Sequence, residues 1–395
     1  METMEEWHYR HLKTNTLINR DDILDVSENI DNSFSGRIDI WGLHIFFVEA
    51  ACMIRNAVYQ YEKGFTDAAF YSVRSALELA RVVTYFSSQS CPLKSDTYRS
   101  WAQGEKFPFD SKVKALLINA GSAYSEIREV LSDFFEMQDD RLKRANKYIH
   151  KQGYKTFYTQ STIQPDLEKA RRHAANELFT DFITNSVIEI ALLRLCVDPF
   201  PVLLQDESVM HKIHFQSVTF PFAEKTINFI GTDKIEKYRS TMFYKSHTEM
   251  YASNEDLCEE AYELMNDEYY NRNSWQKIKP QLNLLSINDQ LAVLIFNFSK
   301  AISDIYFYGG FAHYFSDVHS ANGTIRGFDS RDLRRVKESK AKCNVQYQKA
   351  YMSYFSYNDT ECWIEHNYKF TEQQIQGVHK IIDDTITKNI EFFQK

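Results

Sequence analysis

The sequence predicts a predominantly all-α protein, and three observations carry that prediction. Glycine (12) and proline (7) are scarce among the 395 residues, which disfavours turn-rich all-β folds and long linkers. Apolar residues recur at three- and four-residue spacing over several long segments, as in amphipathic helices. Hydrophobic residues make up 44% of the chain, so a sizeable core can be buried in two or three domains.

Residues 41–64 and 66–86 are expected to form an antiparallel helical hairpin. Gly64 is a typical left-handed stop for the first helix. Thr66 and Asp67 can cap the second helix, and the very short turn between the two forces them to run antiparallel. The apolar positions of the second helix fall at helical spacing: Phe70, Val73, Leu77, Ala80 and Val83.

The rest of the first half continues as a bundle. A loop with at most a short helical turn is expected over 88–110, and a third helix over 111–119. Residues 122–150 read as one long helix or two abutting ones. A further long helix covers 165–197, with Pro165 in its first turn. Residues 1–197, which include an N-terminal extension, are therefore the expected first domain.

A domain boundary is expected at DPFPVLL, residues 198–204, because two nearby prolines stop a helix. Partial alternation over 212–222 and 226–231 predicts a short β-hairpin inside a linker that spans 198–232. The alternation is short, so the hairpin rests on few residues.

Residues 233–395 are predicted to form a second helical region. It should include a helix over 288–308, a basic helix capped by Ser330, and a final helix. Thr371 and Gln374 form a T-x-x-Q capping box for the final helix. The apolar stripe of that helix is Ile375, Val378, Ile382, Ile386, Ile390 and Phe393.

Charge, cysteines and hydropathy exclude several classes of protein. The net charge of −8 argues against a protein that coats nucleic acid by bulk electrostatics. The six cysteines form no C-x-x-C pair, which indicates reduced thiols rather than a disulfide frame or a zinc site. The N-terminal residues lack an apolar signal region, so a cytoplasmic location is expected. The longest apolar stretch, 291–308, contains Asn297, Lys300 and Asp304 and is too polar for a membrane span.

The run RLKRANKYIHKQGYKTFY, residues 141–158, stands out against the acidic chain. Its first fifteen residues hold six lysines and arginines and no acid. On a helix, Lys143, Asn146, Lys147 and His150 share one face. Arg144 lies about 120° around the axis from His150 and ~9 Å along it, within reach of a side chain that curls back.

Arginine and histidine together suit cleavage of RNA. A base removes the proton of a 2′-hydroxyl, which attacks the adjacent phosphorus, and an acid protonates the leaving 5′-oxygen. Histidine transfers protons near neutral pH, and the guanidinium fork stays charged and matches a phosphate. On the residues alone, the alternative is a basic helix end that finishes in a partly buried histidine.

The bundle and this run resemble the HEPN family of prokaryotic defence and toxin ribonucleases. That family carries R-x4-6-H near the end of a helix in an all-α bundle, and the hairpin YEKGFTDAAFYSVRSALELARVVTYF is similar to the first part of such bundles. The resemblance covers 41–197. It implies a metal-independent endoribonuclease without a cofactor, which leaves a 2′,3′-cyclic phosphate and a 5′-hydroxyl.

The resemblance also implies roles for single residues. Arg144 would bind the scissile phosphate and His150 would be the acid or base, with the motifs of a homodimer facing each other. Asn146 could hold a phosphate or orient the ring, and Glu78 would orient the motif arginine. The RNA-binding candidates are Lys143, Lys147, Lys151, Arg74 and Tyr154.

Several alternatives stay open. In this family a polar residue often follows the motif arginine, whereas here that position is Ala145, so the bundle could be an inactive RNA- or protein-binding scaffold. A purely structural helical adaptor is a third reading. Arg74, Glu78 and Arg81 could be an exposed ion-pair ladder, and Tyr154 could be a core residue. The second region, 233–395, would bind a regulatory protein or a phage-derived trigger.

Two signals in the second half are weaker. Residues 326–342 hold seven basic and three acidic residues, which suit a solvated helix face, an RNA backbone contact or a docking face. His313, Asp317 and His319 do not share one helix face, so no metal site is predicted. Motifs for nucleotide-driven enzymes or metalloproteases are absent from the sequence.

Overall fold

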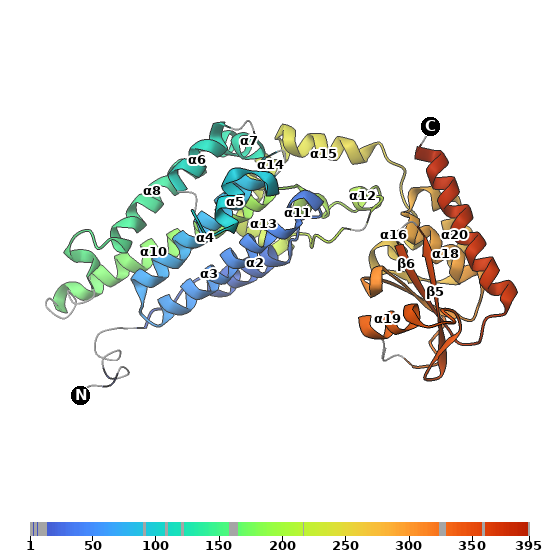
Figure 1. Ribbon diagram of the computed structural model, residues 1–395. Helices are drawn as coiled ribbons and strands as arrows, with labels where there is room; N and C mark the ends of the chain where they lie inside the picture. Colours follow the sequence, from blue (N-terminus) through green and yellow to red (C-terminus); the bar gives the residue numbers. More distant parts are fainter. Residues whose placement is uncertain are drawn as a thin grey trace. The chain divides into compact units, whose positions relative to one another are not determined.

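The chain folds into two compact units, seen in a computed structural model (Figure 1). The structure describes these residues: 3, 6, 14–89, 92–106, 110–119, 122–157, 165–215, 217–323, 329–357 and 360–393. The first unit comprises 1–210 and 218–252, and the second comprises 211–217 and 253–395. Residues 218–252 thus belong with the helical bundle, whereas the sequence suggested a boundary at 198–204.

The regular secondary structure in the described part of the first unit is helical. Its helices are α2 (Arg20–Asn32), α3 (Ile45–Glu62), α4 (Thr66–Ser87), α5 (Asp96–Ala102), α6 (Asp110–Asn119), α7 (Ala123–Val130), α8 (Ser132–Ile149), α10 (Pro165–Leu195), α11 (Phe200–Leu203), α12 (Glu207–Met210), α13 (Glu224–Ile230), α14 (Thr232–Arg239) and α15 (Met242–Ala252). Three 3-10 helices accompany them: Ile38–His44, Pro92–Lys94 and Tyr154–Thr156. The predicted long helices are confirmed, and 122–150 is two abutting helices that meet at Leu131.

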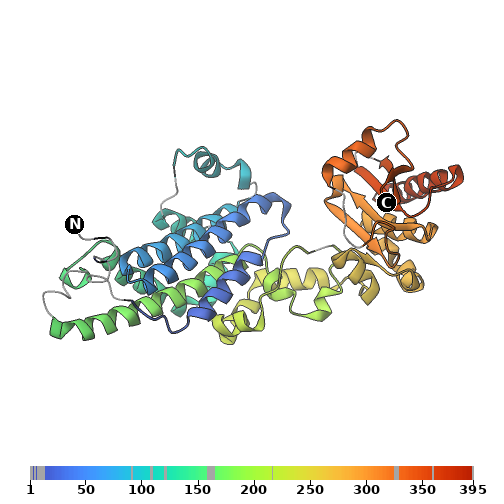
Figure 2. The same ribbon diagram turned by 90° about the horizontal axis from the view of Figure 1, so that it is seen from below.

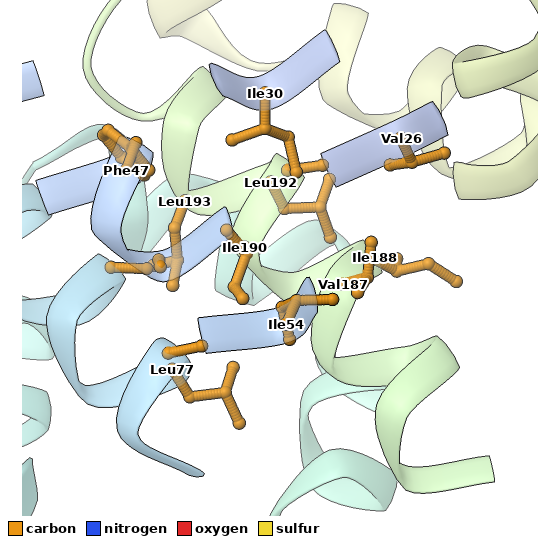
Figure 3. Packing of buried hydrophobic residues seen from close by; sticks show 14 of the residues in the cluster. Val26, Ile30, Phe47, Ile54, Leu77, Val187, Ile188, Ile190, Leu192 and Leu193 are labelled. Carbon is orange, nitrogen blue, oxygen red and sulfur yellow. The ribbon is translucent and has the colours of Figure 1, made fainter. Parts of the chain in front are cut away.

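The centre of this unit is a bundle of α3, α4, α8 and α10, with α2 against α3 (Figure 2). Gly64 follows α3 with a φ of +89°, which lets the chain reverse at once into α4. Ile54, Leu77 and Ile190 come from three helices and are almost fully buried together (Figure 3). Burying a side chain of this size stabilises the fold by about 1.5–3 kcal/mol, so these contacts fix α4 relative to α10.

The second unit combines helices with a mixed sheet. Its helices are α16 (Glu259–Asp267), α17 (Trp275–Ile278), α18 (Ile287–Phe298), α19 (Ser330–Glu338) and α20 (Glu372–Phe393), with 3-10 helices at Arg272–Ser274, Lys279–Leu284 and Tyr308–Gly310. Its strands are β1 (Tyr269–Tyr270), β2 (Ile302–Phe307), β3 (Ala312–Ser316), β4 (Val345–Tyr347), β5 (Ala350–Tyr357) and β6 (Thr360–His366).

The strand order is β1-β3-β2-β6-β5-β4, with β1 and β3 parallel and the other neighbours antiparallel. Alternate residues of the strands point to opposite faces. Ile305 and Ile364 pack with the cluster that includes α16, α18 and α20, whereas Tyr306 and Trp363 pack against α19. The sheet therefore has a helical layer on each face.

Several secondary-structure predictions are wrong, and the largest error is the helical second region 233–395, which contains a six-stranded sheet. The predicted hairpin over 212–222 and 226–231 is not formed by the described residues there, and α13 occupies 224–230. Its buried residues Thr226 and Ile230 are four apart, so the same apolar spacing serves a helix. Within the predicted helix 288–308, α18 ends at Phe298 and β2 follows. A continuous apolar run does not distinguish a buried strand from a helix.

The final helix is as predicted. The Thr371 amide donates to Gln374 Oε1 (2.9 Å) and the Gln374 amide to Thr371 Oγ1 (3.3 Å), which is the expected capping box. The cap of α19 is Asp329 rather than Ser330. Among the described residues, no helix combines the length and apolarity needed to cross a membrane.

Candidate functional site

The candidate site lies at the end of α8. The buried residues of this helix show which of its faces points toward the core. Gln138, Arg141 and Ala145 are buried at helical spacing. His150 is the C-cap residue and is exposed. Its amide donates to the Asn146 carbonyl (2.9 Å), and the chain then leaves the helix through Lys151, whose φ is +52°. The imidazole is therefore held at a helix end and open to solvent.

An arginine does stand beside His150, and it is Arg74 of α4. Its Nη1 lies 3.2 Å from His150 Nε2 and 3.3 Å from Asn146 Oδ1. Its Nε donates to Glu78 Oε1 at 2.8 Å, one turn further along α4. The structure thus brings together Arg74, Glu78, Asn146 and His150, which the sequence singled out on two separate helices.

The chemistry of this group follows from its donors. A guanidinium has only donors, so its contact with His150 is a hydrogen bond when Nε2 is unprotonated and accepts. That contact occupies the Nε2 lone pair, so Nε2 takes a proton from a hydroxyl only once the Arg74 N–H has moved off it. Within the described part of the chain, Arg74 Nη2 has no partner, which leaves two N–H donors for a phosphate.

Arg144 is not next to His150, contrary to the expectation from the motif. Its Nη2 lies 3.6 Å from Asp181 Oδ2 of α10. Asp181 also accepts from Arg141 Nε at 2.9 Å, so one carboxylate serves both arginines. The physical reason is the ~120° between Arg144 and His150 around the helix, which points Arg144 toward α10 while His150 faces α4.

The basic run is less positive than its composition suggests. Lys143 pairs with Asp140 at 2.9 Å, and Lys151 pairs with Asp67 at 2.8 Å. Together with the Asp181 pairs, four of the six basic side chains face a carboxylate. Lys147 is exposed and has no partner in the described part of the chain, so it is the free cation nearest to His150 in sequence on α8.

The aromatic residues of the run divide into two kinds. Tyr148 is half-buried and stacks on Phe70 of α4 with ring centroids 5.0 Å apart. Tyr154 is 76% exposed and touches Phe157 edge-on. Tyr154 is thus a surface residue rather than a core residue, and its ring could stack on a base.

Ala145 has a structural explanation. Its side chain is fully buried in the bundle core. A polar side chain at this position would lose its hydration without a partner, which costs about 1–3 kcal/mol. The alanine after Arg144 therefore follows from how α8 packs.

Arg81 is not part of an exposed ladder, so that reading of the α4 stripe is wrong. It is 1% exposed and lies between two carboxylates, Glu189 at 2.7 Å and Asp110 at 2.9 Å. Burial alone would lower the pKa of the guanidinium, but these two carboxylates outweigh it and raise that pKa. Arg81 is a buried structural ion, whereas Arg74 and Glu78 remain partly exposed.

The second unit has a histidine–carboxylate pair of its own. His313 Nε2 lies 2.9 Å from Asp304 Oδ1 on the neighbouring strand. Groups of His, Cys, Asp or Glu fit to hold a metal ion do not occur among the described residues. The cysteines that the structure describes are all free.

The sequence did not predict that two carboxylates pair with the basic run. Asp181 on α10 and Asp67 on α4 neutralise part of the basic run. Their pairing depends on how α4 and α10 pack against α8, and local spacing carries no signal for it. Comparison with known proteins adds nothing to this geometry, because no family model, curated protein or solved structure matches the chain.

Proposed function

We propose that the protein is a metal-independent endoribonuclease of the HEPN type that acts in bacterial defence or as a toxin. The observation that supports it best is the 3.2 Å contact between Arg74 Nη1 and His150 Nε2 on an exposed helix end. An acceptor imidazole beside a guanidinium is the pair that cleavage by a 2′-hydroxyl needs. In this proposal Arg74 takes the phosphate-binding role first expected of Arg144.

The proposed reaction needs no added group. Arg74 Nη1 shifts from His150 Nε2 to the phosphate, which frees the Nε2 lone pair. His150 Nε2 then takes the proton of the 2′-hydroxyl, and the oxygen forms a bond to phosphorus. The bond from phosphorus to the 5′-oxygen breaks, and that oxygen takes a proton from a second acid. Arg74 Nη2 donates to the phosphate oxygens as charge builds up on them. The products are a 2′,3′-cyclic phosphate and a 5′-hydroxyl.

The second acid is the reason to propose a homodimer. One chain offers a single His150 at this site, so the imidazolium of a second copy would protonate the leaving oxygen. As part of the same proposal, the C-terminal unit binds a regulatory protein or a phage-derived trigger.

The test uses mixed RNA with EDTA present. The parent is expected to cleave and to leave cyclic phosphate ends, identified by mass spectrometry, and His150→Ala is expected to lose cleavage. His173→Ala is the matched control, because His173 is an exposed helical histidine of α10, paired with Glu177. Equal cleavage by parent and His150→Ala would refute the proposal.

A second candidate function is an inactive scaffold that binds RNA or protein. The observation in its favour is that Glu78 and Asp181 hold Arg74 and Arg144, so each candidate arginine already has a carboxylate. The scaffold predicts RNA binding without cleavage, with the same result for the parent and for His150→Ala.

A further inference from the structure

A cluster of arginines stands on the outer face of α19 in the second unit. Arg331, Arg334 and Arg335 follow one another at helical spacing with Glu338, and all four are exposed. With Ser339 they line an open hollow of about 450 Å³. This hollow is far in sequence from the α8 site and belongs to another unit.

The helix that presents these arginines is fixed to the sheet. Leu333 and Val336 are buried against Tyr306, Met352, Tyr354 and Trp363. The indole of Trp363 donates from Nε1 to the Leu333 carbonyl at 2.9 Å. Because both anchors lie on the inner face, the backbone that carries the arginines on the other face is fixed before any ligand binds.

The three guanidiniums have donors to spare. Arg334 has no partner in the described part of the chain, and Arg335 lies 3.8 Å from Asp332. Arg331 pairs with Asp329 at 2.7 Å, but its side chain is 88% exposed. Exposed pairs of this kind contribute at most about 1 kcal/mol, so a phosphate can compete for the guanidiniums.

The surroundings favour a nucleic acid over an acidic peptide. The Arg335 guanidinium lies over the half-buried Tyr347 ring, 5.6 Å from its centroid, whereas the nearby Tyr354 is buried and belongs to the core. Rings beside cations suit unpaired bases, which stack while the backbone phosphates meet the charges. A peptide carboxylate would use the guanidiniums only.

We propose that the outer face of α19 is a docking surface for single-stranded RNA, with Arg331, Arg334 and Arg335 on its phosphates. The choice of RNA rests on the proposed function, since the α8 site would act on the same polymer. The surface adds a second place where the chain holds its substrate, outside the unit that carries the proposed cleavage site.

The test measures binding of a short labelled single-stranded RNA to the full chain carrying His150→Ala, over about 50 to 200 mM salt. The triple variant Arg331→Gln, Arg334→Gln, Arg335→Gln is expected to raise Kd at least about tenfold. It should lower the slope of log K against log salt by about 2, for three phosphate contacts on a single strand.

Two matched variants isolate the surface. Lys279→Gln, Lys380→Gln and Lys388→Gln remove the same charge from exposed positions of the same unit and should leave Kd near that of the parent. Replacing the three arginines by lysine keeps the charge and should keep the salt slope. An equal loss in the control, or a lysine variant with the slope of the glutamine variant, would overturn the proposal.

The outcomes also separate this proposal from the cleavage proposal. If the parent does not cleave RNA but binds it, and the arginine variant loses that binding, the docking surface is supported and the nuclease is refuted. If the parent cleaves RNA and the arginine variant binds RNA with an unchanged Kd, the nuclease is supported and the docking surface is refuted. Poly-glutamate that competes as well as unlabelled RNA would point to an acidic protein and overturn the choice of RNA.

Discussion

Arg74 and His150 are 76 positions apart in sequence, and their side chains meet with Nη1 3.2 Å from Nε2. The helix-end motif alone suggested a different arginine, Arg144, which turns to α10 instead. The difference gives the proposed nuclease a test at the level of single residues.

Arg74→Gln should therefore reduce RNA cleavage far more than Arg144→Gln. Loss of a charged donor to the phosphate in the transition state costs about 10²–10³-fold in kcat. Arg144→Gln removes a half-exposed pair with Asp181 and should change kcat less than tenfold. Single-turnover cleavage with saturating protein measures both. The opposite ranking would restore Arg144 to the role that the family pattern gives it.

Ala145→Asn should destabilise the bundle without adding activity. The side chain at this position is fully buried, so the amide would lose its hydration without a partner. The expected cost is about 1–3 kcal/mol in the free energy of unfolding, measured by urea unfolding. Asn146→Ala is the control for a nearby, less buried position and should cost less.

The buried Arg81 should be far more sensitive to replacement than Arg74. Arg81→Met leaves Glu189 uncompensated in the core, and breaking a buried pair in this way costs about 3–5 kcal/mol. Arg74→Met removes a partly exposed i,i+4 pair worth about 0.3–0.5 kcal/mol. Urea unfolding of the two variants compares these costs, and similar values would contradict the burial of Arg81.

Stability should fall between pH 6.5 and pH 4 because of two buried histidines. Burial lowers the pKa of His44 to about 4 and that of His366 to about 4, from an ordinary value of 6.5. The unfolded chain therefore binds more protons in this range, so stability rises with pH. Each group accounts for a loss of about 3 kcal/mol once the pH is below 4.

His366→Gln tests this dependence most directly. In the parent, His366 Nδ1 donates to the Tyr368 carbonyl at 2.7 Å, so Nε2 accepts from Ser353 Oγ at 2.8 Å. The variant lacks a group that titrates here and should unfold with a flatter dependence on pH. His173→Gln, at an exposed position, should keep the slope of the parent. Identical slopes in all three would contradict the burial argument.

The sequence was most informative where a single helix decides the outcome. The hairpin of α3 and α4 follows from local spacing, although α4 is preceded by Phe65 and has no side-chain cap of the kind expected from Thr66 and Asp67. The capping box of Thr371 and Gln374 is present as its motif predicts. The strand β2 was missed because its apolar run suits either a helix or a strand. Only its pairing with β3 and β6 decides between them.

The candidate site shows the same division. Glu78, Asn146 and His150 could be singled out from helical faces, since each is placed by its own helix. The choice between Arg74 and Arg144 depends on the rotation of α8 between α4 and α10. That rotation is set by buried contacts such as Ala145, whose partners lie far away in sequence.

The second unit includes residues 211–217, a short segment that lies in sequence between the two parts of the first unit. The Leu257 amide donates to the His211 carbonyl at 2.7 Å, and Asn254 Nδ2 donates to the Lys212 carbonyl at 2.8 Å. A protease cut between Ala252 and Ser253 would sever the covalent link yet leave this segment in place. The two fragments should then co-purify under native conditions, and a fragment that starts at Ser253 would lack part of its own fold.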